Sequence, residues 1–411
     1  MTDLRASGAV TGTGDRSQPR AALPALCATQ ITSWGIVYYA FPVLNPQITA
    51  STGWSTTAAT AAFSGALLVS AATGIPVGRI LDRRGPRAVM TTGSVLGVTA
   101  VLAVAHAPNL ITFSAAWLLA GVAMAATFYQ PAFAALTRWW GEDRVRALTI
   151  VTLAGGLAST VFAPLTAALA EHLNWRTTYA ILAAFLALVT IPAHALALRG
   201  PWPPAPSPPS QQVTSSGSVA RSRPFLMLAA ALTLNSFAMY AVVIALVPLL
   251  LARGASPTAA AWALGLGGAG QTLGRTLYGS LASRTGVTTR TVILITLGGA
   301  TTAAFAVVSG PFPLLVGIAI MAGMVRGNLT LLQATAVTDR WGAAHYGRLS
   351  GLLAAPATIA SSLAPFAGAA LARPLGGYPG LFTLLALVST LGAFAAFATM
   401  PRHKLQLVAD R

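Results

Sequence analysis

The chain has 411 residues, of which 55% are hydrophobic and only 8% are charged. Soluble proteins carry about 25% charged residues, so this composition excludes a soluble domain with an ordinary ionic surface. The net charge of +17 would suit a nucleic-acid-binding protein, but the placement of the charges, given below, argues against one. With a single cysteine, Cys27, the chain has no internal disulfide.

Apolar runs long enough to cross a bilayer recur along the whole chain. About twenty consecutive apolar residues span the hydrocarbon core, and they must be helical because lipid satisfies no backbone hydrogen bond. We predict an all-α membrane protein with twelve spans, at approximately 22–48, 57–80, 88–107, 110–136, 147–171, 176–198, 223–251, 258–282, 290–309, 312–337, 347–372 and 380–400.

The basic residues lie mostly on one side of these predicted spans. With the N-terminus placed in the cytoplasm, 20 of the 25 Lys and Arg residues lie inside, three lie outside, and Arg275 and Arg326 fall within spans. An excess of basic residues in the cytoplasmic loops is typical of membrane proteins. We therefore expect a multi-pass protein of the cell inner membrane with both termini cytoplasmic.

A stretch rich in proline and serine divides the chain in the middle. Such a composition cannot form a packed element and indicates a linker. We predict a disordered cytoplasmic tail, an N-terminal six-helix bundle, a cytoplasmic linker, a C-terminal six-helix bundle and a second cytoplasmic tail, at 1–20, 21–198, 199–222, 223–402 and 403–411.

The two halves repeat one another at an offset of 201 residues. The segments that match at this offset are Gly78–Gly85 with Gly279–Gly286, Trp140-Gly141 with Trp341-Gly342, and Ala163-Pro164 with Ala364-Pro365. Because chance poorly explains three coincidences at one spacing, we expect two parallel, pseudo-symmetric bundles. Two such repeats in a membrane protein imply a binding site between them, near the middle of the membrane.

The segment after the second span resembles a signature of the major facilitator superfamily. Gly78-x-x-x-Asp82-Arg83-x-Gly85 matches the family's loop, although Pro86 stands where the family usually has arginine. The resemblance implies alternating access, with Gly78, Asp82, Arg83 and Gly85 helping to close the cytoplasmic side. The simpler interpretation of Asp82 is a solvated charge at a helix end, paired with a neighbouring arginine.

Other segments resemble bacterial members of the monocarboxylate/oxalate-type branch. They are Phe128-Tyr129-Gln130-Pro131, Arg138-Trp139-Trp140, Arg144-x-Arg146-Ala147-Leu148 and Asn174-Trp175-Arg176. Arg275 also lies in the eighth span, where that branch carries its anion-binding arginine. The chain departs from some relatives in having no lysine in the first or eleventh span. Drug-exporting members of the superfamily match less well.

Two arginines inside predicted spans are candidates for substrate binding. An arginine at the bilayer centre costs about 2.5–3.5 kcal/mol on insertion scales, so Arg275 and Arg326 need a reason to be there. A planar guanidinium group matches the geometry of a carboxylate, which makes both residues candidate anchors for an anion. The alternative is that one or both bond helix carbonyls or extend toward the cytoplasm.

The acidic residues and histidines support an anionic substrate by their positions. None of the eight Asp and Glu residues lies in the middle of a span, and the five histidines fall at span ends or in loops. We therefore expect an electropositive cavity. Further candidate lining residues are Tyr38, Tyr129, Gln271 and Asn235, although each could instead serve helix packing. The glycines of Gly270-x-x-x-Gly274 and Gly74-x-x-x-Gly78 predict close helix contacts.

The leading hypothesis is a secondary active or facilitative transporter of a small organic anion, a mono- or dicarboxylate. Efflux of neutral or amphipathic drug-like compounds is the second. A membrane-embedded ligand sensor is a third, but the chain lacks an evident output domain. We expect no enzymatic activity, because no acids and histidines cluster as in an active site. We also expect no cofactor, no metal and no nucleic acid, and a monomer in the lipid bilayer.

Overall fold

The computed structural model describes residues 19–202, 219–341 and 346–399, and all the regular elements in these ranges are helices. The first group comprises α1 (Ala22–Trp34), the π-helix η1 (Gly35–Tyr39), α2 (Ala40–Thr52), α3 (Thr56–His106), α4 (Leu110–Thr127), α5 (Tyr129–Trp140), the 3-10 turn η2 (Gly141–Asp143), α6 (Arg144–Gly156), α7 (Ala158–His172), α8 (Trp175–Pro192) and the π-helix η3 (Ala193–Ala197). The second comprises α10 (Arg223–Ala252), α11 (Pro257–Arg284), α12 (Val287–Val307), α13 (Phe312–Thr335), α14 (Thr338–Trp341), α15 (Tyr346–Ala372) and α16 (Tyr378–Phe397).

The twelve predicted spans all fall on helical structure. Nine helical segments within the described ranges are long and apolar enough to cross a membrane, and because α3 covers two spans they account for ten of the twelve; the first and the eighth span are the other two. The two segments of α3 meet at Gly85, whose φ of 77° and ψ of 171° interrupt the helix where the sequence predicts a loop. The first span is divided into α1, η1 and α2, and the eighth is α11. Most of the predicted tails and linker, namely 1–18, 203–218 and 403–411, lies outside the described residues, as do 342–345 and 400–402 of the predicted second bundle.

The offset of 201 residues recurs in the helix bounds themselves. Helix α10 begins at Arg223, 201 residues after α1 begins at Ala22. Helix α11 begins at Pro257, 201 residues after α3 begins at Thr56. Even a helix cap is repeated, because the hydroxyls of Ser55 and Ser256 each accept a hydrogen bond from the amide three residues later. The two bundles are thus structural repeats.

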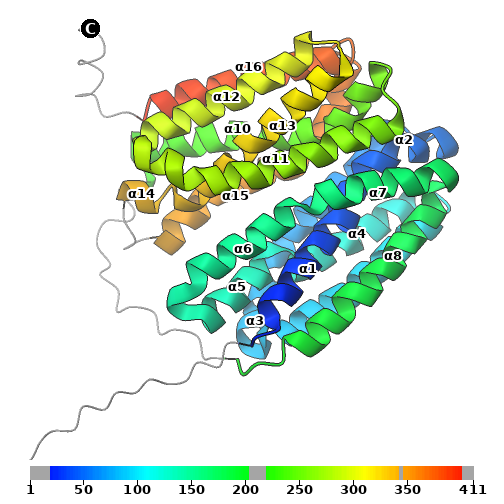
Figure 1. Ribbon diagram of the computed structural model, residues 1–411, viewed down its shortest axis with the longest axis horizontal. Coiled ribbons are helices and arrows are strands. Elements are labelled where there is room, and N and C mark those ends of the chain that lie inside the picture. The colour runs from blue at the N-terminus through cyan, green and yellow to red at the C-terminus, as the bar shows by residue number, and fades with distance from the viewer. Residues whose placement is uncertain (1–18, 203–218, 342–345, 400–411) are drawn as a thin grey trace, which may run out of the picture.

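The halves lie side by side, with their helices running lengthwise (Figure 1). We call the end at which α1 begins and α16 ends the terminal end, and the other the opposite end. Across the boundary between the halves, α7 packs along α11 and α15 packs along α3. These pairs are related by the repeat, since α7 corresponds to the second part of α15 and the first part of α3 corresponds to α11.

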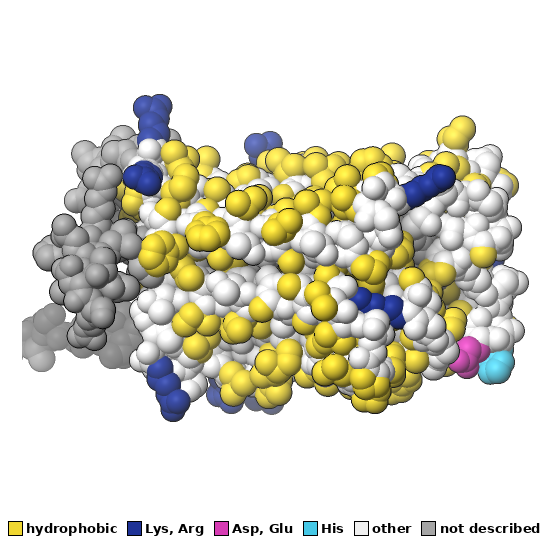
Figure 2. Space-filling model, turned by 90° about the horizontal axis from the view of Figure 1, so that it is seen from above, with side chains coloured by type: hydrophobic (Ala, Val, Ile, Leu, Met, Phe, Trp, Pro, Cys, Tyr) yellow, Lys and Arg dark blue, Asp and Glu magenta, His cyan; other side chains and the backbone are white. Residues whose placement is uncertain are grey.

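The outer surface is hydrophobic along the length of the helices. Figure 2 shows hydrophobic side chains spread over one long face, with an acidic side chain at one end. Examples are Leu188 on α8 and Leu391 and Phe394 on α16, whose side chains are each at least 60% exposed. Exposed apolar area of this extent is unfavourable in water but suits contact with lipid.

Candidate functional site

Broken helices shape the centre of the first half. Helix α1 passes into a π-helical turn at Gly35, and α4 and α5 are separated by Phe128, whose ψ of −160° is extended. A break frees backbone carbonyls from their helical partners. The amide Nε2 of Gln30 donates to one such carbonyl, that of Thr127, at 2.7 Å. The first span is thereby fastened to the break in the fourth.

Aromatic side chains line this central region. The Trp34 ring stacks on Phe128 with centroids 4.1 Å apart, and it lies 5.3 Å from the ring of Tyr129. The ring of Tyr38, which is buried, has its centroid 5.4 Å from that of Trp34. The Tyr38 ring also approaches Tyr240 of the second half at 6.5 Å. We call Trp34, Tyr38, Phe128 and Tyr129 the aromatic wall.

Close packing of α11 against α13 sets the position of one candidate arginine. A methyl group on Gly270 or Gly274 would overlap the backbone of α13, and one on Gly327 would overlap the carbonyl oxygen of Gln271. The prediction of a close contact at Gly270 and Gly274 is therefore confirmed. At this short spacing the Arg326 Nε donates to the Gln271 Oε1 at 3.0 Å. Gln271 thus orients the guanidinium group of Arg326.

Arg275 lies one turn further along α11 and reaches into the first half. Its side chain is buried, and its Nη1 donates to the backbone carbonyl of Thr152 on α6. The Tyr129 hydroxyl faces the same guanidinium group. The Nε of Arg275 is buried without a hydrogen-bond partner among the described residues. Arg275 therefore bonds a helix carbonyl, as one sequence interpretation expected, but that carbonyl belongs to the other half.

The two arginines have no carboxylate partner within the described part of the chain. The ion pairs found there are Arg138 with Asp82 and Arg290 with Asp339, both near the terminal end. Arg275 is buried and Arg326 is half-buried; because a buried cation without a counter-ion is costly, an anion beside Arg275 is favoured. Arg275 and Arg326 together, hereafter the arginine pair, form a centre of positive charge between α11, α13 and the aromatic wall. Tyr240 interacts electrostatically with both arginines.

Asn235 lies near Arg326 within the second half. Together with Arg326 it lines a cavity of about 40 Å³ between α10, α12, α13 and α16. Its Nδ2 is buried without a hydrogen-bond partner in the described residues. The space is sufficient for water, which would satisfy this amide. Gln271 thus contacts Arg326 and Tyr129 faces Arg275, whereas Asn235 lies inside the second half.

The signature loop after the second span is held within the first half. Asp82 is paired with Arg138 at the end of α5. The interpretation that Asp82 pairs with an arginine next to it in the sequence is therefore wrong. The Arg138 guanidinium also lies 4.4 Å from the ring centroid of Trp202, and the indole Nε1 of Trp202 donates to the Asp82 carbonyl at 3.1 Å. The start of the connection between the halves is thus fastened to the loop.

The glycines of this loop differ in role. Gly85 has a positive φ and lies against Trp202, where a Cβ atom would be 3.2 Å from the indole, so the turn requires glycine. The predicted close contact is present at Gly74, where a Cβ atom would lie 2.9 Å from the Gln130 Oε1, but it is wrong at Gly78, where a Cβ atom would meet no described atom within 4 Å. Arg83 is exposed. The corresponding loop of the second half is held by an ion pair between Arg290 and Asp339. In this pair the arginine precedes the acid along the chain, whereas in the first half the acid comes first.

Hydrogen bonds join the halves from the opposite end to the middle. At the opposite end Thr57 donates to the carbonyl of Ala369 at 3.4 Å, and Thr258 donates to the carboxylate of Glu171. Deeper in the molecule, Thr160 donates to the carbonyl of Gly265 at 2.9 Å. The bond of Arg275 to Thr152 continues this series. The opposite end is therefore closed in this conformation.

Comparisons with known proteins agree with this architecture. The family model of the Major Facilitator Superfamily matches residues 26–252 and 226–410. Monocarboxylate transporter 13 of Bos taurus is 30% identical over 310 residues, which cover 74% of this chain and 70% of the relative. The same transporter of Rattus norvegicus is 30% identical over 319 residues, with coverages of 74% and 69%.

Solved structures show the same fold at low identity. A point mutant of the nucleoside transporter NupG has a TM-score of 0.78 at 15% identity and covers 93% of this chain and 100% of its own. A bacterial homologue of the human lysosomal transporter Spinster, in an inward-facing and occupied conformation, has a TM-score of 0.71 at 16% identity, with coverages of 92% and 95%. The chain belongs to the major facilitator superfamily, in the branch of the monocarboxylate transporters.

Proposed function

We propose that this chain transports a small organic anion, a mono- or dicarboxylate, across the cell inner membrane by alternating access. The substrate carboxylate binds at the arginine pair, with Tyr38, Tyr129 and Gln271 around it. Asn235 lines the small cavity that it shares with Arg326. The observation that carries the proposal is a pair of arginines at the boundary between the halves, without a carboxylate partner among the described residues.

The position of Arg275 supports a link between substrate binding and movement of the halves. Arg275 is on α11, yet one of its nitrogens is used by the Thr152 carbonyl of the first half. An arriving carboxylate is a stronger acceptor than a neutral carbonyl, because charge-assisted hydrogen bonds are shorter and stronger. It therefore competes for the same guanidinium group and alters a bond between the halves. A ligand shifts a conformational equilibrium only through such a difference in contacts.

The closed opposite end supports alternating access. The terminal end carries most of the basic residues, so we assign it to the cytoplasm. In this orientation the conformation is closed to the outside. Movement to the outward-open state must break the hydrogen bonds at the opposite end and form new contacts at the terminal end. There we assign the role of gate to the loop of Gly78, Asp82, Arg83 and Gly85, and the ion pair of Asp82 with Arg138 supports this assignment.

The relatives named monocarboxylate transporters support a carboxylate over the second candidate, a neutral drug-like compound. The experiment is uptake into liposomes that contain the purified protein, with labelled mono- and dicarboxylates, a neutral amphipathic compound and an organic cation compared in parallel. We expect uptake of at least one carboxylate above protein-free liposomes, and none of the neutral compound or the cation. Uptake of the neutral compound alone would refute the anion assignment.

A further inference from the structure

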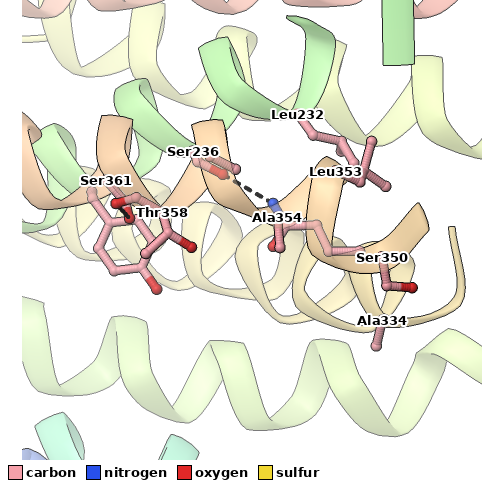
Figure 3. Close-up of a pocket in the computed structure, with 11 residues that line it drawn as sticks. Leu232, Ser236, Ala334, Ser350, Leu353, Ala354, Thr358 and Ser361 are labelled. Atoms are coloured by element: carbon pink, nitrogen blue, oxygen red, sulfur yellow. Dashed lines mark hydrogen bonds between the residues drawn. The ribbon is translucent and has the colours of Figure 1, made fainter. Parts of the chain in front are cut away.

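A cavity of about 300 Å³ lies between the arginine pair and the terminal end of the second half. Helices α10, α13 and α15 enclose it, and Figure 3 shows side chains from these helices facing one another across it. Six of its eleven lining residues carry a hydroxyl or an amide, and none is charged: Ser236, Tyr240, Gln333, Ser350, Thr358 and Ser361. The others are leucines and alanines. We call this cavity the hydroxyl chamber.

The chamber adjoins the arginine pair at Tyr240. This residue lines the chamber, and it also interacts electrostatically with Arg275 and Arg326 and lies 6.5 Å from the Tyr38 ring. From Tyr240 the chamber extends along α10 through Ser236 toward the terminal end. A molecule whose carboxylate lies at the arginine pair therefore has a space for the rest of its chain on the terminal side of Tyr240.

The polar groups of the chamber are arranged to meet neutral hydrogen-bonding partners. The Gln333 Nε2 donates to the Ser236 Oγ at 3.0 Å, which links α13 to α10 and fixes both side chains. Thr358 and Ser361 are three residues apart on α15, so their side chains share one face of that helix. Hydroxyl and amide groups both donate and accept, as do the hydroxyls of a ligand.

The size and composition of the chamber argue against a short or purely apolar chain. At about 30 Å³ per water, 300 Å³ corresponds to about ten water-sized groups, so the smallest acids would leave it mostly hydrated. Gln333 already bonds Ser236, and the Ser361 Oγ donates to the Thr358 carbonyl at 2.9 Å, but an unbranched apolar chain would still displace water from Tyr240, Ser350 and Thr358 without replacing its hydrogen bonds, which is unfavourable. Leu232 and Leu353 supply apolar surface that suits the C–H faces of a hydroxylated chain.

We propose that the hydroxyl chamber is a specificity subsite for the hydroxylated chain of a carboxylate whose charged end lies at the arginine pair. The substrate class is therefore a hydroxy or polyhydroxy acid rather than a simple fatty acid. This assignment rests on the proposed anion transport. Of these polar groups Ser236 is buried, Thr358 is exposed to the cavity and the others are half-buried; groups that bond the hydroxyls of a substrate discriminate against an analogue without them, because those hydrogen bonds are then lost.

The test compares ligands that differ in one feature at a time. Binding to the purified full-length protein is measured by titration calorimetry with gluconate, with hexanoate, which has the same charge and carbon count but no hydroxyls on its chain, and with sorbitol, which keeps the hydroxyls but has no carboxylate. We expect gluconate to bind at least about tenfold more tightly than hexanoate, and sorbitol not to bind.

Two variants test the chamber itself. Thr358→Val and Ser361→Ala each remove a hydroxyl, and Thr383→Val removes one from an exposed site on α16 as the control. A hydrogen bond contributes about 0.5–1.5 kcal/mol, so each chamber variant should weaken gluconate binding about two- to tenfold and leave hexanoate binding unchanged.

The outcomes separate this inference from the function on which it rests. Equal binding of gluconate and hexanoate, or equal weakening of both by Thr358→Val, overturns the subsite and leaves anion transport standing. Sorbitol binding as tightly as gluconate supports recognition of hydroxyls but refutes the arginine pair as the anchor. If neither acid binds the unmodified protein, the proposed function and the subsite both fail.

Discussion

Replacing Arg275 with glutamine or alanine removes the positive charge from the proposed anion site. Glutamine keeps a polar N–H group, but its amide ends two bonds short of the Nη1 that donates to the Thr152 carbonyl, so neither variant keeps that bond. We therefore expect both variants to lose substrate affinity.

The size of the effect follows from the burial of the guanidinium group. Removing one partner of a buried charged pair costs about 2–5 kcal/mol, so a value near 3 kcal/mol weakens substrate binding about 100-fold. Thr152 lies within α6 and is half-buried, so its carbonyl does not depend on Arg275 alone, and we expect similar thermal midpoints for Arg275→Gln and Arg275→Ala. Arg275→Lys keeps a charge without the planar fork and should bind less well than the unmodified protein.

The assay is equilibrium binding and liposome uptake of the same labelled carboxylate, together with thermal unfolding in detergent. Arg284→Gln is the matched control, because Arg284 is on the same helix but exposed at its terminal end. Normal binding and uptake by Arg275→Gln would refute the role of Arg275 as the anion anchor. A loss of the same size in Arg284→Gln would show that net positive charge, rather than this site, governs uptake.

Three further predictions follow from the loop, the helix contact and the positions of the acids. Asp82→Asn and Arg138→Gln each break the same ion pair, so both should slow uptake more than they weaken binding; an unchanged uptake rate would make Asp82 a solvated loop residue. Gly274→Val should lower the stability of the folded protein by about 1–3 kcal/mol or more, because the larger side chain forces α11 away from α13. Gly279→Val is the control, since its side chain enters open space; equal yields of folded protein from the two variants would contradict the close contact. Uptake measured against pH with two substrates of different acidity should follow each substrate's own carboxyl pKa, because no acid lies in the middle of a span; one shared midpoint would point to a group such as Glu171 or His194.

The helices and their repeat were predictable because they depend on local composition. Apolar runs of about twenty residues must be helical in lipid, and the 201-residue offset is visible in short matches such as Ala163-Pro164 with Ala364-Pro365. The structure extends this offset to the start of α10 and of α11. The close approach of α11 and α13 was likewise signalled by the spacing of Gly270 and Gly274.

The partners of the charged residues were not predictable, because they depend on packing between distant segments. Asp82 has several arginines near it in sequence, yet it pairs with Arg138, which lies 56 residues away but at the same end of the bundle. The acceptor of Arg275 is a backbone carbonyl, that of Thr152, and such an acceptor carries no residue-type signal.

Locking the opposite end tests the central claim of alternating access most directly. Thr57 and Ala369 are joined there by a hydrogen bond of 3.4 Å, so cysteines at both positions, in a Cys27→Ser background, can be linked by a short reducible thiol cross-linker. We predict that the cross-link abolishes carboxylate uptake, that reduction restores it, and that binding from the terminal side persists throughout. Single-cysteine variants treated with the same reagent serve as controls. Full uptake with the cross-link in place would contradict the account, because the substrate would then cross without the opposite end opening.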